Sequence, residues 1–284
     1  GSSMDAVHQV SQAVIAGDIK SGIASGVEDM FTVPMGGFVP DFNEELNEKE
    51  FYIGMGETAE NLAKKLDISR DDQEDFSVLS HKKALNAIDN GRFDNEIVSI
   101  EFNGQVFSKD EGPRAPDIDK MKSLSPAFDV NGSITAATSS PISLGASAIL
   151  IGNEDMIKDS DSAFEIISRS IVGVDWKTMG EGPLPATEKV LKNAGLSLND
   201  IDVIELNEAF AAQSLYVIRK GGWDIDKINL NGGAIALGHP LGCSGARIIT
   251  TLTNVMRQRD VELGLATMCI GTGQGIATII KRIK

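Results

Sequence analysis

Apolar residues recur along this chain with two different spacings. A return every three or four positions predicts amphipathic helices, whereas short unbroken apolar runs bounded by turn residues predict buried strands. Helices are expected at 3–16, 70–88, 185–194 and 208–219, and from Leu241 onward, where the pattern is clearest over 244–257. Strands are expected at 97–102, 146–151, 163–171, 201–206, 228–230, 263–268 and 276–281. Alternating helices and strands predict an α/β fold.

Two segments far apart in the chain resemble each other. Residues 18–25 (DIKSGIAS) and 260–267 (DVELGLAT) agree in identity or type at six of eight positions. Each follows a predicted helix and leads into a short apolar strand. A helix–Asp–strand unit that occurs twice predicts a duplicated α/β architecture with parallel strands. Chance similarity between short α/β units is the alternative.

The segment between residue 31 and residue 142 differs from the rest of the chain in composition and periodicity. Residues 31–57 are rich in Gly, Pro and Met and show no clear period. A helix start is predicted at Ser69, because acidic residues follow it in the first turn. Residues 108–128 carry three prolines and are expected to form an extended loop. We therefore expect 31–142 to be an insertion between two strands of one α/β half, with a second half from about residue 162.

Composition narrows the classes of function. The chain has 284 residues, of which 42% are hydrophobic, and a net charge of −15. That acidity argues against a nucleic-acid partner, and an anionic ligand must then meet a local positive site or backbone N–H groups. No apolar run approaches about 20 residues, so no membrane span is expected. Two cysteines make no disulfide framework, and we expect a reducing, cytoplasmic setting.

The candidate chemistry lies in three short blocks near the end of the chain. They are Asn207–Ala211 (NEAFA), Asn231–Pro240 (NGGAIALGHP) and Cys269–Gly275 (CIGTGQG). The last block lacks the spacing of a dinucleotide-binding loop, and no phosphate-binding loop with Gly-Lys-Ser/Thr occurs. Three histidines without cysteine partners at ligand spacing make a zinc site improbable.

Each block contributes one reactive side chain. His239 precedes a predicted helix, whose N-terminus favours a neutral imidazole that can accept a thiol's proton. Cys269 ends a strand and enters a glycine-rich turn, where backbone N–H groups can stabilise a thiolate or an oxyanion. Asn207 directly follows a buried strand, where α/β folds place ligands. The alternatives are a turn histidine, a small buried cysteine and a helix N-cap asparagine.

Together and in this order, the three blocks resemble the thiolase family, and the likeness extends over essentially the whole chain. The resemblance implies a layered αβαβα sandwich of two similar halves, with the first half incomplete and a loop domain inserted. Residues 1–30 and 143–161 would be the remnant of the N-terminal half, 31–142 the substrate-covering loop domain and 162–284 the C-terminal half. A homodimer or homotetramer is expected.

The resemblance also implies an activity, the thiolytic cleavage of 3-ketoacyl-CoA to acetyl-CoA and a shortened acyl-CoA. His239 would activate the nucleophile, Asn207 would hold a water in the oxyanion site, and Cys269 would shuttle a proton to and from the acetyl carbon. The Gly271 N–H would help form a second oxyanion hole. The substrate-binding residues would be Ser140, Arg114, Ala209 and Phe210. Coenzyme A would be a substrate, and no cofactor or metal is expected.

The nucleophile is the main departure from the family pattern. Thiolases carry it in a stretch like Cys-Gly-Ser-Ser-Met, and this chain begins with Gly1-Ser2-Ser3-Met4. We therefore expect the chain alone to be inactive, with an uncovered sheet face. Two other functions stay open: an acetyl-CoA acetyltransferase that forms acetoacetyl-CoA, and a non-catalytic scaffold that binds acyl-CoA. The related ketoacyl synthases carry a second histidine where this chain has Cys269.

Overall fold

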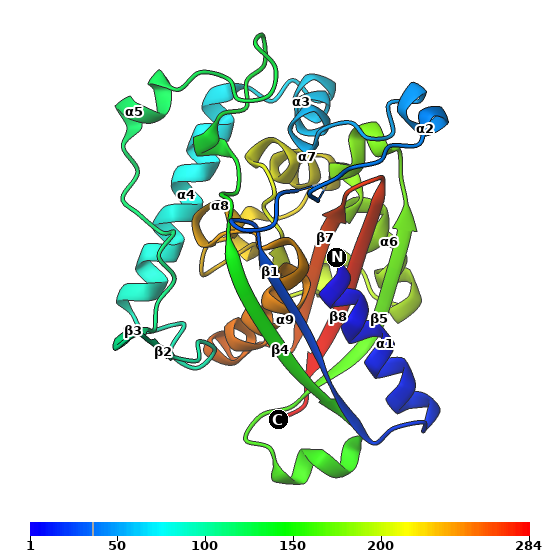
Figure 1. The fold of residues 1–284 in the computed structure, drawn as a ribbon. Helices are drawn as coiled ribbons and strands as arrows, with labels where there is room; N and C mark the ends of the chain where they lie inside the picture. The colour runs from blue at the N-terminus through cyan, green and yellow to red at the C-terminus, as the bar shows by residue number, and fades with distance from the viewer. Residues whose placement is uncertain (36) are drawn as a thin grey trace.

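The computed structural model describes residues 1–35 and 37–284 (Figure 1). The helices are α1 (Ser2–Ala16), α2 (Glu44–Glu48), α3 (Met55–Lys65), α4 (Arg70–Asp89), α5 (Ile118–Ser123), α6 (Pro183–Ala194), α7 (Ala211–Gly221), α8 (Ala234–Leu237) and α9 (Leu241–Arg259). The strands are β1 (Ser21–Asp29), β2 (Ile100–Phe102), β3 (Gln105–Phe107), β4 (Leu144–Gly152), β5 (Phe164–Gly173), β6 (Val203–Leu206), β7 (Leu263–Ile270) and β8 (Gln274–Arg282).

Helices and sheets are stacked in layers. A four-stranded sheet has the order β5-β8-β7-β6, and β1 pairs with β4 in a second sheet. Helices α1 and α9 lie between the two sheets, since α9 contacts β1 and β4 on one side and β6 and β7 on the other (Figure 1). Helix α6 covers the other face of the four-stranded sheet. The predicted layered α/β sandwich is confirmed.

Strand direction differs from the prediction. Among the named strands of the described residues, only β6 and β7 pair in parallel, whereas β1–β4, β5–β8 and β7–β8 are antiparallel. Strand β8 follows β7 after the tight turn 271–273, and a tight turn can join only antiparallel strands. The sequence repeat nevertheless corresponds to a structural one, because α1–β1 is later joined by antiparallel β4 just as α9–β7 is joined by β8.

The remaining differences lie in short elements. The strand expected at 97–102 is reduced to Ile100–Phe102, which forms a hairpin with β3 through Asn103-Gly104, both at positive φ. The expected loop 108–128 contains α5, and α2 and α3 were not predicted. The strand expected at 228–230 is a single bridge from Ile228 to Ile204, since Asn229 adopts a left-handed φ of 46°.

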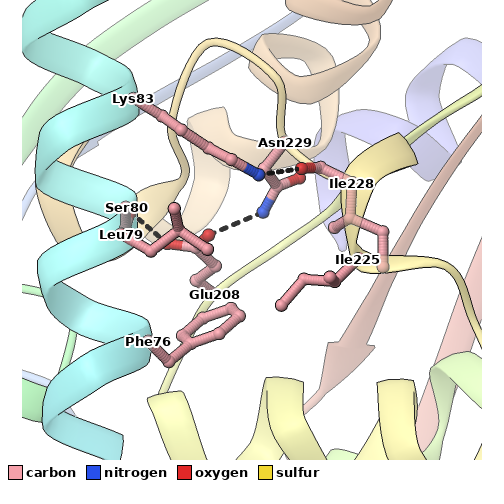
Figure 2. A pocket seen from close by; sticks show the side chains of 8 residues that line it. All are labelled: Phe76, Leu79, Ser80, Lys83, Glu208, Ile225, Ile228 and Asn229. Atoms are coloured by element: carbon pink, nitrogen blue, oxygen red, sulfur yellow. Dashed lines mark hydrogen bonds between the residues drawn. The ribbon is translucent and has the colours of Figure 1, made fainter.

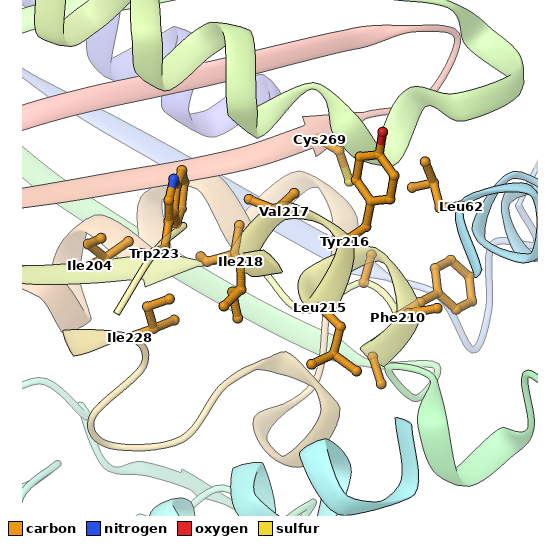
Figure 3. Close-up of a cluster of buried hydrophobic side chains, with 14 of the residues drawn as sticks. Leu62, Ile204, Phe210, Leu215, Tyr216, Val217, Ile218, Trp223, Ile228 and Cys269 are labelled. Atoms are coloured by element: carbon orange, nitrogen blue, oxygen red, sulfur yellow. The ribbon is translucent and has the colours of Figure 1, made fainter. Parts of the chain in front are cut away.

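The outer face of the β1–β4 sheet is apolar and exposed. Ile23, Val27, Leu144 and Leu150 each expose about two thirds of their surface, at 67%, 71%, 66% and 64%. The main core lies on the opposite side of the molecule, between the four-stranded sheet and α3, α4, α6 and α7. Cys269 belongs to this core together with Tyr216 and Val217 of α7 (Figure 3). The Cys269 thiol is therefore packed at the border of the hydrophobic core.

Glycines allow α1 to lie directly on α9. A Cβ on Gly245 would stand 2.4 Å from the backbone nitrogen of Met4, a distance that no real side chain tolerates. The Ser3 hydroxyl fastens the same contact: it donates to the carbonyl of Cys243 at 3.1 Å and accepts from the N–H of Ala246 at 2.9 Å. The first turn of α1 is thus held against the first turns of α9.

The substitution Gly245→Ala tests this close contact. The added methyl group must push α1 away from α9, and overpacking of this kind costs about 1–3 kcal/mol of the free energy of unfolding. Gly173→Ala is the matched control, because a Cβ at Gly173 meets no atom within 4 Å. Urea unfolding should show a loss for Gly245→Ala alone. Equal stability of the two variants would contradict the glycine-limited packing.

Candidate active site

The topology brings the three sequence blocks to one place. Asn207 directly follows β6, and its N–H donates to the carbonyl of Thr267 on β7 at 3.0 Å. Cys269 lies two residues further along β7, and His239 lies just before α9, which packs on both strands. Parallel strands end at the same edge of a sheet. Asn207 and Cys269 therefore become neighbours at this edge, although they are far apart in the sequence.

Asn207 and His239 face each other. The Nδ2 atom of Asn207 is 3.4 Å from Nε2 of His239. Asn207 is completely buried, and its Oδ1 receives no hydrogen bond from the described residues. A buried carbonyl oxygen without a donor is costly, and a small polar molecule with a hydrogen to donate would satisfy it.

Hydrogen bonding determines which nitrogen of His239 carries the proton. The Ser244 hydroxyl is 2.5 Å from Nδ1 of His239 and donates to the carbonyl of Pro240 at 2.9 Å. Because that hydroxyl has a single hydrogen, it must accept from an Nδ1–H group. The neutral ring therefore presents the lone pair of Nε2 toward the amide of Asn207. This is the tautomer that can accept a proton from a substrate or a nucleophile.

Both titratable groups of the site are neutral near pH 7. Burial, with a smaller contribution from Arg247, lowers the pKa of His239 to about 3. Burial raises the pKa of the Cys269 thiol to about 11. Cys269 at rest is therefore a proton donor rather than a thiolate, and His239 is a free base.

The backbone nitrogen of Gly1 lies at this site, close to both His239 and Cys269. A Cβ on Gly1 would stand 2.3 Å from Cδ1 of Ile270, so a larger residue at this position would have to displace the Ile270 side chain. The start of α1 and the end of β7 therefore meet beside the imidazole.

The turn after Cys269 faces α3. A Cβ on Gly271 would be 3.4 Å from Sδ of Met55, the first residue of α3. Thr272 and Gly273 both have positive φ, at 66° and 92°, which folds the turn back onto Val174. Within the described part of the chain, the Gly271 N–H donates to no acceptor. It is thus available to a group that enters between α3 and the turn.

The predicted substrate-binding residues separate into two groups. The N–H of Ser140 donates to the carbonyl of Ala209 at 3.0 Å, and Phe210 forms a β-bridge with Ser139. Ser140 therefore lies beside Ala209 and Phe210, which follow Asn207 closely in the sequence. Phe210 is also the extended N-cap of α7, which explains why that helix starts at Ala211 and not at residue 208.

Arg114 is exposed and contacts none of the four predicted catalytic residues. Its N–H donates to Nδ1 of His81 at 3.4 Å, and its guanidinium donates to the carbonyl of Gly112. Gly112 packs against Ala236 of α8, where a Cβ would meet the carbonyl oxygen at 2.5 Å. The structure therefore connects Arg114 to the site only through the helix that precedes His239.

Sequence patterns did not predict three supporting residues. They are Ser244, which holds Nδ1 of His239; Ser143, whose hydroxyl accepts from the His239 N–H at 3.2 Å; and Met55. The signal for Ser244 was its place in the first turns of the helix after His239, five residues on. Among residues 1–35 and 37–284, no three His, Cys, Asp or Glu side chains are grouped as metal ligands. No helix in the same ranges is long and apolar enough to cross a membrane.

Comparison with known proteins agrees with the fold. The family model described as "Thiolase, N-terminal domain" matches residues 1–155, and "Thiolase, C-terminal domain" matches 162–282. The chain is 50% identical to 3-ketoacyl-CoA thiolase of Shewanella loihica, over 99% of this chain and 76% of that protein. It is 47% identical to the Idiomarina loihiensis enzyme of the same name, over 100% and 76%.

Solved structures agree as well. Human mitochondrial 3-ketoacyl-CoA thiolase in complex with CoA superposes with a TM-score of 0.90 at 36% identity, over 100% of this chain and 76% of that one. The dimeric peroxisomal thiolase of Saccharomyces cerevisiae also gives 0.90, at 38% identity over 99% and 74%. The fold and the site thus define a protein of the acyltransferase class. The chain belongs to the thiolase family, as the sequence blocks predicted.

The hydroxyl of Ser244 should control the tautomer of His239. In Ser244→Ala the Nδ1–H loses its acceptor, so the proton is no longer confined to Nδ1 and Nε2 loses part of its free lone pair. Imidazole ¹⁵N NMR is practical because the chain has only three histidines. Thr253→Ala is the control, since that hydroxyl also donates to a carbonyl within α9. Unchanged His239 signals in Ser244→Ala would contradict the assignment.

His239 should remain neutral where an ordinary histidine titrates. With a pKa of about 3 in the folded protein, its ¹⁵N signals should stay constant from about pH 8 to pH 5. In urea-unfolded protein the same ring should titrate near pH 6.5, which serves as the control. The unfolded chain then binds the proton first, so this group lowers the stability of the fold as pH falls below 6.5. A midpoint near 6.5 in the folded protein would contradict the burial argument.

Proposed function

We propose that this chain is an acyl-CoA C-acyltransferase that cleaves 3-ketoacyl-CoA with free CoA, giving acetyl-CoA and a shortened acyl-CoA. The observation that carries the proposal is that Asn207, neutral His239 and protonated Cys269 lie together beside Gly1 at the start of α1. The names of the relatives from Shewanella loihica and Idiomarina loihiensis, and the CoA complex of the human protein, support the same chemistry.

The attacking thiolate would come from the position immediately before Gly1. A cysteine joined there by a peptide bond would lie next to the amide of Gly1, which is already beside His239 and Cys269. Nε2 of His239 would take the thiol's proton, and the thiolate would attack the 3-keto carbon. Two easier steps then replace one difficult carbon–carbon cleavage.

Cys269 would manage the second proton. When the bond between C2 and C3 breaks, its electrons move to C2 of the departing acetyl-CoA, and the Cys269 thiol donates its proton to that carbon. In the second half-reaction the thiol of a new CoA gives its proton to Cys269 and attacks the acyl-enzyme. The raised pKa of Cys269 supports this role, because it keeps the thiol protonated until a carbanion forms.

Two groups of donors would stabilise negative oxygen. Asn207 would hold a water through its Oδ1, which has no other donor among the described residues, and that water with His239 would bind the thioester oxygen. The Gly271 N–H would face the oxygen of the tetrahedral intermediate, beside the N–H of the nucleophile. Such preorganised donors usually provide the largest part of catalysis in acyl transfer.

Substrate contacts and assembly complete the proposal. Ser140, Ala209 and Phe210 would contact the pantetheine arm, and Arg114 would meet the far end of CoA. We assign 31–142 to a substrate-covering domain, 1–30 with 143–161 to the N-terminal half, and 162–284 to the C-terminal half. CoA is a substrate here and not a cofactor. We further propose a cytoplasmic homodimer or homotetramer, supported by two free cysteines and the dimeric yeast relative.

Two alternatives differ in measurable ways. The structure described as Bacillus anthracis acetyl-CoA acetyltransferase superposes with a TM-score of 0.86 at 37% identity, over 99% of this chain and 76% of that one, which favours an enzyme for short acetyl units as the second candidate. A scaffold that binds acyl-CoA without chemistry is the third. It would have no need of a neutral imidazole next to a buried thiol.

The decisive experiment is a cleavage assay on acetoacetyl-CoA and on a long 3-ketoacyl-CoA. It should use the gene's complete product and, separately, this chain with a single cysteine placed before Gly1. We expect cleavage to fall by about 10²–10⁴-fold in His239→Ala and in Cys269→Ala. Cys243→Ala, a buried cysteine of α9, is the control and should retain activity.

The outcomes separate the three functions. Preference for the long substrate supports the degradative enzyme, and exclusive use of acetoacetyl-CoA supports the acetyltransferase. A folded protein that binds CoA and cleaves neither substrate would establish the scaffold and overturn the proposal.

A further inference from the structure

Glu208 is buried next to the site, but the proposed reaction does not use it. It follows Asn207 directly and is 2% exposed. Its Oε2 accepts from the Ser80 hydroxyl at 2.7 Å and from the Ile235 N–H at 3.2 Å. Its Oε1 accepts from Nδ2 of Asn229 at 2.7 Å. Figure 2 shows the carboxylate between α4 and the segment that carries Asn229.

Asn229 connects this carboxylate to the end of β6. Its Oδ1 accepts from the N–H of Leu206 at 2.9 Å, and its Nδ2 donates to the carbonyl of Leu206 at 2.8 Å. The second hydrogen of Nδ2 goes to Glu208. If the side-chain amide of Asn229 were rotated by 180°, it would lose both hydrogen bonds to the backbone of Leu206. The backbone directly before Asn207 is therefore fixed by the same asparagine that Glu208 binds.

The other side of the carboxylate carries the segment that leads to His239. A Cβ on Gly233 would lie 2.0 Å from Cδ of Glu208, so the backbone of residue 233 rests directly on the carboxyl group. The Gly233 N–H donates to the Ser80 hydroxyl at 3.1 Å, and Gly232 packs on Ala84 of α4 in the same way. Helix α8 starts at Ala234 and ends one residue before Gly238-His239. This explains the paired glycines of the second sequence block.

We infer that Glu208 is a positioning residue, whose acceptor-only carboxylate sets the geometry between the amide of Asn207 and the ring of His239. Glu208 acts on Asn207 through the peptide bond that joins them and through Asn229. It acts on His239 through Gly233, Ile235 and α8, which lead to the histidine. The importance of this geometry for turnover rests on the function proposed above. The geometry itself is independent of that function.

The hydrogen-bond pattern excludes an amide at this position. In Glu208→Gln one carboxyl oxygen becomes an NH₂ group of nearly the same size. At the Oε2 position the NH₂ would point at the N–H of Ile235, which belongs to the backbone and cannot turn. At the Oε1 position it would point at Nδ2 of Asn229, which the two contacts to Leu206 lock. Both orientations place donor against donor.

Burial and nearby charges act on Glu208 in opposite directions. Burial is the larger effect and raises the pKa of Glu208, and the three hydrogen bonds and the charge of Lys83 reduce that rise. Lys83 itself donates to the carbonyl of Ile228 at 2.8 Å, on the same segment (Figure 2). The other buried acid nearby is Glu205, whose pKa is raised to about 8 by burial.

Glu208→Gln is therefore compared with Glu205→Gln. Both residues are 2% exposed, but an oxygen of Glu205 lies 3.8 Å from the guanidinium of Arg247, and within the described residues Glu205 makes no hydrogen bond to 229–239. Since Glu205 is largely protonated at pH 7, its amide is a close mimic. Imidazole ¹⁵N NMR of the chain should show displaced His239 signals in Glu208→Gln and unchanged ones in Glu205→Gln. His8 of α1, far along the chain and bonded to Thr278, is the internal reference.

Turnover is measured in parallel on the cleavage-competent protein. We expect kcat to fall at least about tenfold in Glu208→Gln, because small displacements of catalytic groups are costly, with KM changed by less than about twofold. Ser80→Ala is the milder variant, should Glu208→Gln fail to fold, and should change His239 and kcat in the same direction. Unchanged His239 signals and kcat in a folded Glu208→Gln, or in Ser80→Ala, overturn the inference.

The two proposals fail separately. If the parent protein cleaves no ketoacyl-CoA, the proposed function is lost, while displaced His239 signals in Glu208→Gln still establish the positioning role. If the parent protein is active and Glu208→Gln equals it in both measurements, only the positioning role is lost.

Discussion

The contact between α1 and α9 is the constraint on which the rest of the structure depends. Two helices enclosed between two sheets must lie close together, and Gly245 with the Ser3 hydroxyl permits that approach. Both helices begin at the same end of the sandwich. Their first turns bring Gly1 and His239 to one point, and β6 and β7 bring Asn207 and Cys269 to it. The site is thus a consequence of how the middle layer packs.

Much of the fold follows from local pattern. The long helices α4 and α9 were predicted nearly to the residue, because their periodicity and the Ser69 cap are local signals. Strand direction was not predictable in this way, since the pairing of β1 with β4 joins segments more than a hundred residues apart. The Asn103-Gly104 hairpin was missed although its turn signal is local. Asn229 interrupts a predicted strand because it adopts a left-handed φ, and its side chain binds the backbone of Leu206 at the end of β6.

The site shows the same division. Asn207, His239 and Cys269 were predicted from their blocks, whose glycines and chain order are visible in the sequence, and the structure places Asn207 beside His239. The protonation states and the supporting hydrogen bonds of these side chains were not visible in the sequence. The tautomer of His239 depends on how Ser244 uses its single hydrogen, and the bond from Ser80 to Glu208 spans 128 positions. Arg114 was placed by loose similarity, and its role as a substrate-binding residue stays a prediction.

The contact of α1 with α9 also has a consequence for biosynthesis. Ser3 bonds to partners 240 and 243 positions later, and His8 bonds to Thr278. While the ribosome is still making the middle of the chain, the apolar stripe with Met4 and Val7 has no helix to rest on. Contacts of such large sequence separation form late and slowly. The nascent chain therefore exposes the apolar face of α1 until α9 has been made, and protection by chaperones matters most before α9 emerges.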